Sequence, residues 1–451
     1  MGLAPHDLRR ANRAAQKRLN AMEASLTGRH APSVQEPPPE PSPRAEGLIV
    51  WLAGSSLLIN NFDLGIFALA LPQIQASLGI PEAEIGLFTG LLRLGVLLAF
   101  PLTFLADKIG RRRILLVTII GMTAATIGTA FAQTPAQFLM LQILARCFGY
   151  AEEMLCYVIL AEEIAAARRG LATGRMAALG ACGYGLSALL YGAVDQLPHG
   201  WRDFYLIGAV GLGLVVLLRT KLGETRRFVA LRGDSQGFAA RSSQALSPLI
   251  SLFRAYPKRL VGLVCMTAPF WFGVTSATAL LSKHLQNEVG FAHGEVGMMY
   301  LFGGAVSILG YFLAGRISDR VGRRRLLTVS IPVAAGLLAL LYASSDPKLI
   351  VACWIGAMFM LFASEVTIAA FTSELFPTSF RATAAGARVT VNVAAMLGGL
   401  ACESALFGVF GAHATAVMAL LAAAPMALVS IWLLLPETAA RRLEDISPEI
   451  R

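Results

Sequence analysis

The amino-acid sequence predicts an all-α polytopic membrane protein, with twelve transmembrane helices arranged as two six-helix bundles. Three observations predict this class. Of the 451 residues, 56% are hydrophobic and 15% are charged, whereas soluble domains contain about 45–50% apolar and about 25% charged residues. Apolar runs of about 20 residues, long enough as helices to cross a ~30 Å hydrocarbon layer, recur along the chain. A strongly basic turn between two such runs occurs twice.

The apolar runs are continuous and lack the alternation of barrel strands. Each is therefore expected to be a helix, which satisfies its own backbone hydrogen bonds inside lipid. The expected helices span residues 47–71, 84–106, 113–133, 136–160, 170–193, 203–221, 258–281, 295–316, 325–344, 349–371, 383–408 and 412–435.

These segments divide the chain into five parts. Residues 1–46 are polar and Pro-rich, without the apolar core of a signal peptide, and are expected to form a disordered cytoplasmic tail. The N-terminal six-helix bundle covers 47–221 and the C-terminal six-helix bundle covers 258–435. A cytoplasmic linker over 222–257 joins them, and 436–451 form a cytoplasmic C-terminal tail.

Positive charge is distributed unequally between the two sides of the membrane. The net charge of +10 is compatible with nucleic-acid binding, but the loops expected outside hold only Arg202, Lys283 and Lys348 among 38 Lys and Arg. An excess of Lys and Arg in cytoplasmic loops is the usual pattern of membrane proteins. The sequence therefore predicts a multi-pass protein of the plasma (inner) membrane, with both termini cytoplasmic, the lipid bilayer as its partner and no nucleic acid.

The basic turn belongs to a longer internal repeat. Residues 107–113, Asp-Lys-Ile-Gly-Arg-Arg-Arg, recur as Asp-Arg-Val-Gly-Arg-Arg-Arg at 319–325, an offset of 212 residues. The same offset relates three further pairs of charged residues, Glu153 and Glu365, Glu162 and Glu374, and Arg169 and Arg381. Several features in one register indicate duplication. Two six-helix copies in the same orientation are the parallel-repeat layout of a transporter.

Four segments carry a family resemblance. Residues 102–113 and 315–325 resemble the loop 2–3 signature of the major facilitator superfamily. Residues 223–228 and 436–446 resemble the sequences that follow helices 6 and 12 in sugar porters. The chain thus resembles the branch of sugar porters, organic ion transporters and metabolite–proton symporters. This resemblance implies a central site that opens alternately to each side, powered by the proton gradient without another cofactor.

Charged residues at the cytoplasmic helix ends form two predicted gate clusters. They comprise Asp107, Arg111, Arg112, Glu162 and Arg169 in the first copy, and Asp319, Arg323, Arg324, Glu374 and Arg381 in the second. The resemblance implies that pairs among them latch the outward-facing state and separate when the cytoplasmic side opens. Alternatively, the arginines only fix the topology.

Charges inside the expected helices are the sharper functional signal, because an ionisable group at the bilayer centre costs ~2.5–3.5 kcal/mol on insertion scales. Helical rise places Asp63, Arg93 and Arg146 at one level, ~12–15 Å below the outer end. By the resemblance, Asp63 is the proton-coupling acid and Arg146 its partner. The alternative is a permanent salt bridge that neutralises both charges.

Further residues are candidates for the substrate and proton sites. Arg93 leaves a surplus of positive charge that a carboxylate substrate can balance, unless Glu152 or Glu153 neutralises it. Glu153 and Glu365 bind a proton or a cationic substrate, or else join helices by hydrogen bonds. Glu403, near an outer helix end, is expected to be partly solvated.

Aromatic and amide side chains complete the candidate set. Phe270 and Trp271 clamp a ring-bearing substrate or simply pack, and the segment around them lacks the amides with which sugar porters hold hexoses. Asn60, Gln142 and Asn392 are possible polar contacts.

The sequence as a whole predicts a secondary active transporter, not an enzyme. No phosphate-binding loop, catalytic constellation or metal-ligand cluster is found in the sequence, so that neither ATP nor a metal is expected. The favoured function is proton-coupled transport of a small organic solute, preferably an organic anion such as a carboxylate, by a monomer. Proton-driven efflux of drugs or organic cations is the alternative within transport. A membrane sensor that binds a ligand without moving it is the alternative from another class.

Overall fold

The computed structural model describes residues 43–165, 168–219, 247–377 and 379–439. The predicted N-terminal tail therefore lies outside the described residues except for its last four. The predicted linker is described only in its last eleven residues, and the C-terminal tail only in its first four.

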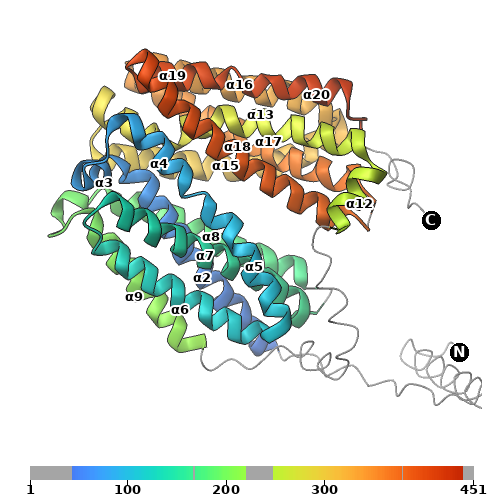
Figure 1. Cartoon of the computed structure of the whole chain (residues 1–451), viewed down its shortest axis with the longest axis horizontal. Coiled ribbons are helices and arrows are strands. Elements are labelled where there is room, and N and C mark those ends of the chain that lie inside the picture. Colours follow the sequence, from blue (N-terminus) through green and yellow to red (C-terminus); the bar gives the residue numbers. More distant parts are fainter. Residues whose placement is uncertain (1–42, 166–167, 220–246, 378, 440–451) are drawn as a thin grey trace, which may run out of the picture. The chain divides into compact units, whose positions relative to one another are not determined.

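Helices occupy each of the twelve predicted spans (Figure 1). The N-terminal half contains α2 (Pro43–Leu69), α3 (Leu71–Leu78), η1 (Glu82–Glu84), α4 (Ile85–Leu91), α5 (Leu94–Ile109), α6 (Arg111–Ala130), α7 (Pro135–Glu163), α8 (Arg169–Tyr191), η2 (Val194–Gln196) and α9 (Trp201–Arg219). The C-terminal half contains α12 (Ser247–Ala255), α13 (Pro257–Ala279), α14 (Leu281–Lys283), the π-helical η3 (His284–Val289), α15 (His293–Val321), α16 (Arg323–Ala343), α17 (Pro347–Leu375), α18 (Arg381–Phe410), α19 (His413–Leu421), η4 (Ala424–Met426) and α20 (Ala427–Leu433).

Within the described residues, nine helical stretches are long and apolar enough to cross a membrane. The long helices α7, α8 and α9 take the three remaining predicted spans. In α7 the charged residues Arg146, Glu152 and Glu153 lower the hydropathy of a helix that is otherwise apolar. The predicted class, an all-α polytopic membrane protein, is confirmed.

Two predicted spans are broken helices. The second span divides into α4 and α5 at Leu92 and Arg93, where the backbone N–H of Arg93 donates to the carbonyl of Gly90, three residues back. The twelfth span divides into α19, η4 and α20 around Pro425, which has no N–H to continue the α-helical pattern. Apolar composition alone does not reveal such breaks.

The duplicated basic turn has the same backbone conformation in both halves. Gly110, between α5 and α6, has φ 121°, and Gly322, between α15 and α16, has φ 109°. Glycine adopts positive φ without the steric cost that a Cβ imposes. We call the end of the molecule that carries these turns the basic end, and the opposite end, with η1, α14 and η3, the far end.

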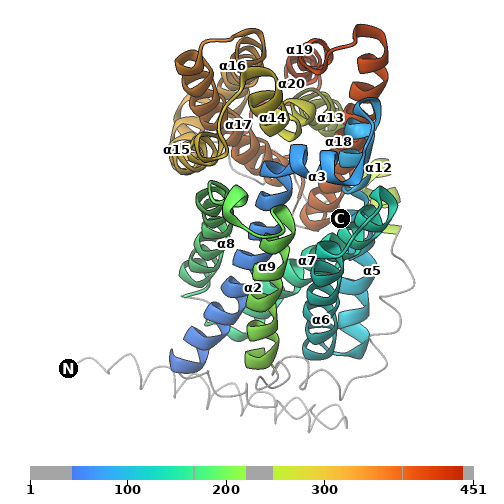
Figure 2. The same cartoon turned by 90° about the vertical axis from the view of Figure 1, so that its left-hand side faces the viewer.

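The duplication extends to helix packing. The N-terminal half pairs α2 with α8, α5 with α7, α6 with α7 and α6 with α9. The equivalent pairs in the C-terminal half are α13 with α18, α15 with α17, α16 with α17 and α16 with α19. Between the halves, α4 contacts α18 and α8 contacts α15. These two contacts are equivalent, because the repeat relates the span of α4 and α5 to α15, and α8 to α18. Figure 2 looks onto the far end, where α3 also contacts α14.

Large apolar side chains are exposed on the outward surfaces of the helices, including Trp51, Phe104, Val210, Phe312 and Leu433. So extensive an apolar surface is unfavourable in water and marks contact with a partner or with lipid. In a chain with spans of this length, the hydrocarbon of the bilayer covers it.

Candidate functional site

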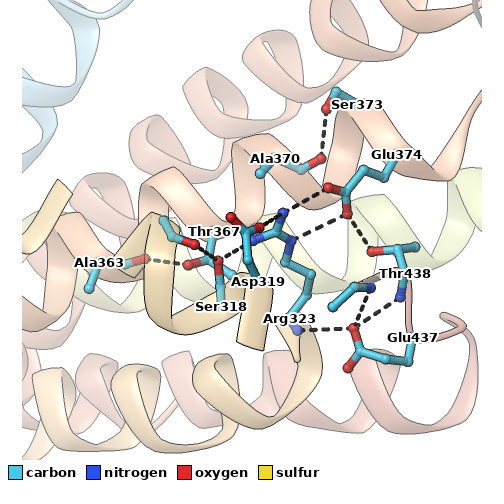
Figure 3. A network of polar contacts seen from close by, with 12 residues as sticks. Ser318, Asp319, Arg323, Ala363, Thr367, Ala370, Ser373, Glu374, Glu437 and Thr438 are labelled. Carbon is cyan, nitrogen blue, oxygen red and sulfur yellow. Dashed lines mark hydrogen bonds and ion pairs between the residues drawn. The ribbon is translucent and has the colours of Figure 1, made fainter. Parts of the chain in front are cut away.

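At the basic end of the C-terminal half, Arg323 is the centre of a network of ion pairs (Figure 3). Its Nη2 lies 2.6 Å from Asp319 Oδ1 and 2.8 Å from Glu374 Oε1. Nη1 also donates to the hydroxyl of Ser318. Because the Arg323 side chain is only 9% exposed, solvent screens these pairs less than it screens surface pairs.

Glu437 and Thr438 belong to this network, although sequence reasoning did not assign them to the gate. The Glu437 carboxylate accepts from the backbone N–H of Arg323 at 2.9 Å and of Arg324 at 3.1 Å, so that it caps the start of α16. Thr438 donates to Glu374. Burial opposes ionisation of Glu437, but the backbone N–H donors outweigh it and lower the pKa of this carboxyl. The Pro-Glu-Thr sequence at 436–438, within the segment that resembles the ending of sugar porters, is the signal that could have indicated this role.

The equivalent pair in the N-terminal half is Arg111 with Glu162, 2.9 Å apart and similarly buried. Glu46, at the start of α2, adds a second pair with Arg168 at 3.0 Å. Arg112 lies next to Arg111 at the start of α6, and the side chain of Asp107 lies outside the described part. Between described residues, the ion pairs of the basic end stay within one half, and the predicted latching role stays a prediction.

Three predicted gate arginines bind backbone carbonyls instead of carboxylates. Nε of Arg169 donates to the Ile164 carbonyl at 2.9 Å. The repeat-related Arg381 donates to the Phe376 carbonyl at 3.3 Å. Arg324 donates to the Trp432 carbonyl at 2.8 Å and stacks on the ring of the same residue. Carbonyls at helix C-termini lack intrahelical donors and favour cations, which explains these contacts.

Asp63, Arg93 and Arg146 lie in α2, at the break between α4 and α5, and in α7, respectively. Arg146 interacts electrostatically with both other residues. Gly95 brings α5 against α7 here, since a Cβ at Gly95 would lie 2.7 Å from Arg146 Cβ. The residues that sequence reasoning grouped by level therefore come from three adjacent helices.

Asp63 and Arg146 do not form the permanent salt bridge that was the alternative prediction. Both side chains are buried, and no ion pair joins them in the part of the chain that the structure describes. Oδ1 of Asp63 and Nε of Arg146 have no hydrogen-bond partner. The Arg146 guanidinium instead lies over the ring of Phe67, 5.0 Å from its centroid.

Arg93 lies at the break between α4 and α5 and has no acidic partner among the described residues. Its electrostatic neighbours are Tyr150, Tyr184 and Arg146. Glu152 is directed elsewhere, because it accepts from Thr118 Oγ1 at 2.7 Å and is buried. Glu153 forms no ion pair with Arg93 either. Neither glutamate neutralises this guanidinium.

The repeat-related acids Glu153 and Glu365 differ in their surroundings. Glu365 forms an ion pair with Arg388 of α18 at 2.6 Å. Glu153 makes no hydrogen bond or ion pair with a described residue, and it lies in electrostatic range of Tyr157 and Tyr184. The two halves therefore present one paired and one unpaired carboxyl group.

Three predicted substrate contacts, Phe270, Gln142 and Asn60, are each buried inside a single bundle in this structure. Phe270 is 0% exposed in the core of the C-terminal half. Gln142 is fully buried and donates to Thr129 at 3.3 Å. Asn60 is buried against α7 at Gly149, where no side chain would fit. Periodicity within an apolar helix does not show which face points to the centre.

Trp271 and Asn392 remain candidates, since they contact each other between α13 and α18. With the amide oriented to suit both neighbours, Asn392 accepts from Trp271 Nε1 and donates to the Arg388 carbonyl, each at 3.1 Å. Trp271 is partly exposed.

A model of the Major Facilitator Superfamily matches residues 53–392 and 263–449. The chain belongs to this superfamily. It is a membrane transporter, and the resemblance inferred from the sequence is confirmed.

Among similar transporters of known name is the probable 4-methylmuconolactone transporter of Cupriavidus pinatubonensis, 25% identical over 88% of this chain and 92% of the relative. The cis,cis-muconate transport protein of Acinetobacter baylyi is 25% identical over 75% of this chain and 82% of the relative. The gallate transporter of Pseudomonas putida is 26% identical over 74% and 80%, respectively.

Solved structures of the superfamily share the fold. A D-xylose–proton symporter aligns with a TM-score of 0.69 at 15% identity, covering 88% of this chain and 99% of that one. The inward open conformation of the xylose transporter from E. coli aligns with a TM-score of 0.70 at 15% identity, covering 89% and 99%.

The two halves of this transporter are joined at the far end by a polar cluster that sequence reasoning missed. Lys283 of α14 donates to Gln75 at 2.7 Å and lies 2.7 Å from Glu82 of η1. His413 of α19 lies between Glu82, at 3.0 Å, and Glu403 of α18, at 2.7 Å. Glu403 is 0% exposed, so the expectation of partial solvation is wrong.

A second far-end cluster surrounds Gln73 of α3. Its amide Nε2 donates to Gln286 at 2.6 Å and faces His293 at 2.8 Å, and its Oε1 accepts from the Tyr191 hydroxyl at 2.9 Å. His293 also contacts Asp195 at 2.7 Å. Together the two clusters join the two halves at the far end.

Proposed function

We propose that this transporter moves an organic carboxylate by proton-coupled alternating access. The observation that carries the proposal is Arg93, a guanidinium at a helix break inside a membrane span, without an acidic partner among the described residues. Unpaired charge is costly at this depth, and such residues usually mark a substrate or ion pathway. A carboxylate is the group that a guanidinium binds best, through two parallel hydrogen bonds.

The surroundings of Arg93 suit a planar, unsaturated acid. Arg146 adds a second positive charge, and Tyr150 and Tyr184 add aromatic rings with hydroxyl groups. The names of the relatives support this chemistry, because cis,cis-muconate and gallate are both unsaturated carboxylates. A benzoate transport protein of Acinetobacter baylyi, 24% identical over 70% of this chain, supports it further.

In this proposal Asp63 carries the coupled proton. Its lack of an ion pair fits the protonated acid, which has no need of Arg146. Loss of the proton creates a buried negative charge that attracts Arg146, and the helix arrangement then depends on protonation. The basic end faces the cytoplasm by the distribution of Lys and Arg, so that the closed far end belongs to an inward-facing state.

The test is uptake into vesicles that contain the purified protein, with an alkaline interior and radiolabelled cis,cis-muconate, gallate or benzoate outside. We expect uptake of at least one of them above empty vesicles. Arg93→Gln should reduce it at least tenfold, the equivalent of ~1.4 kcal/mol, because the guanidinium fork is lost. Arg175→Gln is the matched control, since Arg175 is an exposed arginine of α8, and it should retain uptake.

The organic cation alternative rests on Glu153, the unpaired carboxyl group near Tyr157 and Tyr184. Transport of ethidium but none of the three carboxylates, abolished by Glu153→Gln, would replace our proposal by this one. Flux no greater than that of empty vesicles for every compound would favour the non-transporting sensor.

A further inference from the structure

His413 connects the two halves of the molecule through two carboxylates at once. Its Nδ1 lies 2.7 Å from Glu403 Oε1 of its own half, and its Nε2 lies 3.0 Å from Glu82 Oε2 of the other half. The ring also stacks on Phe407, with centroids 4.2 Å apart, which fixes its plane. Both ring nitrogens are therefore directed at acceptors.

This geometry requires one proton more than a neutral imidazole carries. A neutral ring has one N–H donor and one acceptor nitrogen. Between two ionised carboxylates the acceptor nitrogen would face an oxygen lone pair, which is repulsive. The cluster satisfies both contacts when the ring is an imidazolium, or when one carboxyl group holds the additional proton.

The charge balance of the cluster agrees with this count. The ionised Glu82 and Glu403 carry two negative charges, and Lys283 carries one positive charge. One additional proton makes the group neutral, which matters because Glu403 is completely buried. Gly86 of α4 closes over this carboxylate, since a Cβ there would lie 2.2 Å from Glu403 Oε2.

The other titratable groups around His413 do not supply this charge. Glu288 interacts electrostatically with His413 and pairs with His284 at 2.9 Å. Tyr342 of α16 is buried, interacts electrostatically with Glu403 and Glu288, and donates its hydroxyl to the Ala277 carbonyl. The titratable residues of α13, Lys258, Arg259 and Cys265, lie in the half of that helix nearer the basic end.

A second histidine between the halves provides an internal comparison. His293 contacts Asp195 through Nδ1 and the Gln73 amide through Nε2, at 2.7 and 2.8 Å. The Gln73 Nε2 is a donor, because its Oε1 accepts from Tyr191. A neutral ring with its proton on Nδ1 thus satisfies both partners. The contacts of His293 therefore need no proton beyond the one that a neutral ring carries.

We propose that the His413 cluster is a proton-binding gate, which takes up one proton when Glu82 and Glu403 close around the ring and releases it when the far end opens. The closed far end is then favoured at low pH on that side. An imidazole in water loses its additional proton near pH ~6.5. Because the closed state binds one proton more than the open state, the ratio of open to closed molecules increases as the pH rises above that value. For one proton this increase is at most tenfold per pH unit.

This gate rests on the proposed function only in that the two halves must move, and it is separate from Asp63. During uptake, a proton from the outside would promote closure behind the substrate. The gate proton stays at the far end, so it biases the conformational change without being carried across the membrane.

The experiment measures the far-end distance between spin labels by pulsed electron paramagnetic resonance. Labels are attached at Ala136→Cys and Ser345→Cys, exposed far-end positions in opposite halves, after replacement of the six natural cysteines. The protein is held in lipid nanodiscs between pH 5.5 and 8.5. We expect the longer, open distance to gain population as the pH rises.

The variants separate the proposed gate from its alternatives. His413→Gln, which takes up no proton, should remove the pH dependence. His293→Gln and the exposed His199→Gln should retain it. Glu403→Gln leaves the ring between one carboxylate and one amide, as at His293. This variant should move the midpoint of the pH-dependent change from closed to open molecules to lower pH. Retained pH dependence in His413→Gln, or its loss in His293→Gln, would overturn the proposal.

Failure of the gate differs from failure of the transport cycle. If the distance changes on addition of cis,cis-muconate but not with pH in the unmodified protein, the halves move and the gate proposal is wrong. A single distance under all conditions and in all variants would contradict both the gate and alternating access.

Discussion

At the residue scale, the N-terminal half holds buried charges that lack the partners expected of a structural core. Asp63 has an unsatisfied oxygen, and Arg93 has no acidic partner in the described chain. Buried charges in a core that serves only stability are paired and hydrogen-bonded. Groups left unpaired in one conformation are available to a proton, to a substrate or to each other in another.

Replacing Asp63 by Asn should preserve the exchange of carboxylate across the membrane but not its accumulation against a concentration gradient. The amide has the size of a protonated carboxyl group but binds no proton, so that exchange of labelled for unlabelled carboxylate should persist. Accumulation driven by a pH gradient should fall at least tenfold. Counterflow and gradient-driven uptake in the same vesicles measure the two quantities, and Asp203→Asn in the first turn of α9 serves as the control. Unchanged accumulation would reject Asp63 as the coupling acid.

Sequence reasoning found these residues because a charge inside an apolar run is conspicuous. It did not predict that Phe270, Gln142 and Asn60 are buried, because uncharged residues in such runs leave the central face of the helix undetermined. The central neighbours of Arg93 are instead Tyr150 and Tyr184.

At the element scale, the helices lie within a few residues of the predicted spans because hydrocarbon thickness sets their length. The breaks at Arg93 and around Pro425 were not predicted, because each lies inside an apolar run whose length matches a single span. The basic turns were predicted as turns, but their cap was not. Glu437 reaches α16 from a segment more than a hundred residues away.

The turn between α15 and α16 should tolerate no side chain at its glycine. Gly322 has φ 109°, and a Cβ there would lie 2.8 Å from Glu437 Oε2. Gly322→Ala should therefore destabilise the protein by about 1–3 kcal/mol, seen as a lower midpoint of thermal unfolding in detergent.

Gly315 of α15 provides the matched control for this substitution. It lies in the same helix, and a Cβ there meets nothing within 4 Å. Gly315→Ala should be neutral or slightly stabilising, because alanine favours a helix over glycine by about 0.5–1 kcal/mol. Equal midpoints for the two variants would refute the proposed strain at Gly322.

At the scale of the whole molecule, the two halves repeat the same helix pairs but not the same chemistry. Arg111 with Glu162 and Arg323 with Glu374 are equivalent. Asp63, Arg93 and Arg146 have no charged counterparts 212 residues later, where the sequence has Thr275, Ala305 and Met358. The architecture is symmetric, while the proposed proton and substrate site belongs to the N-terminal half.

The contacts between the halves could not be predicted from the sequence. Glu82 and His413 are 331 residues apart, and each looks like a solvated loop residue by itself. Only the packing of α4 on α18 brings them together. Spacing rules act within one helix or one repeat, so they give no information about pairs that form between the two halves.

Proton-coupled carboxylate transport is tested most directly by the pH inside vesicles that contain the protein and a pH-sensitive dye. We add cis,cis-muconate, gallate and benzoate in turn outside, with no pH gradient at the start. We predict that a transported carboxylate acidifies the interior, and that Arg93→Gln and Asp63→Asn abolish this acidification. Entry of a carboxylate without acidification, or acidification that both variants retain, would contradict the account.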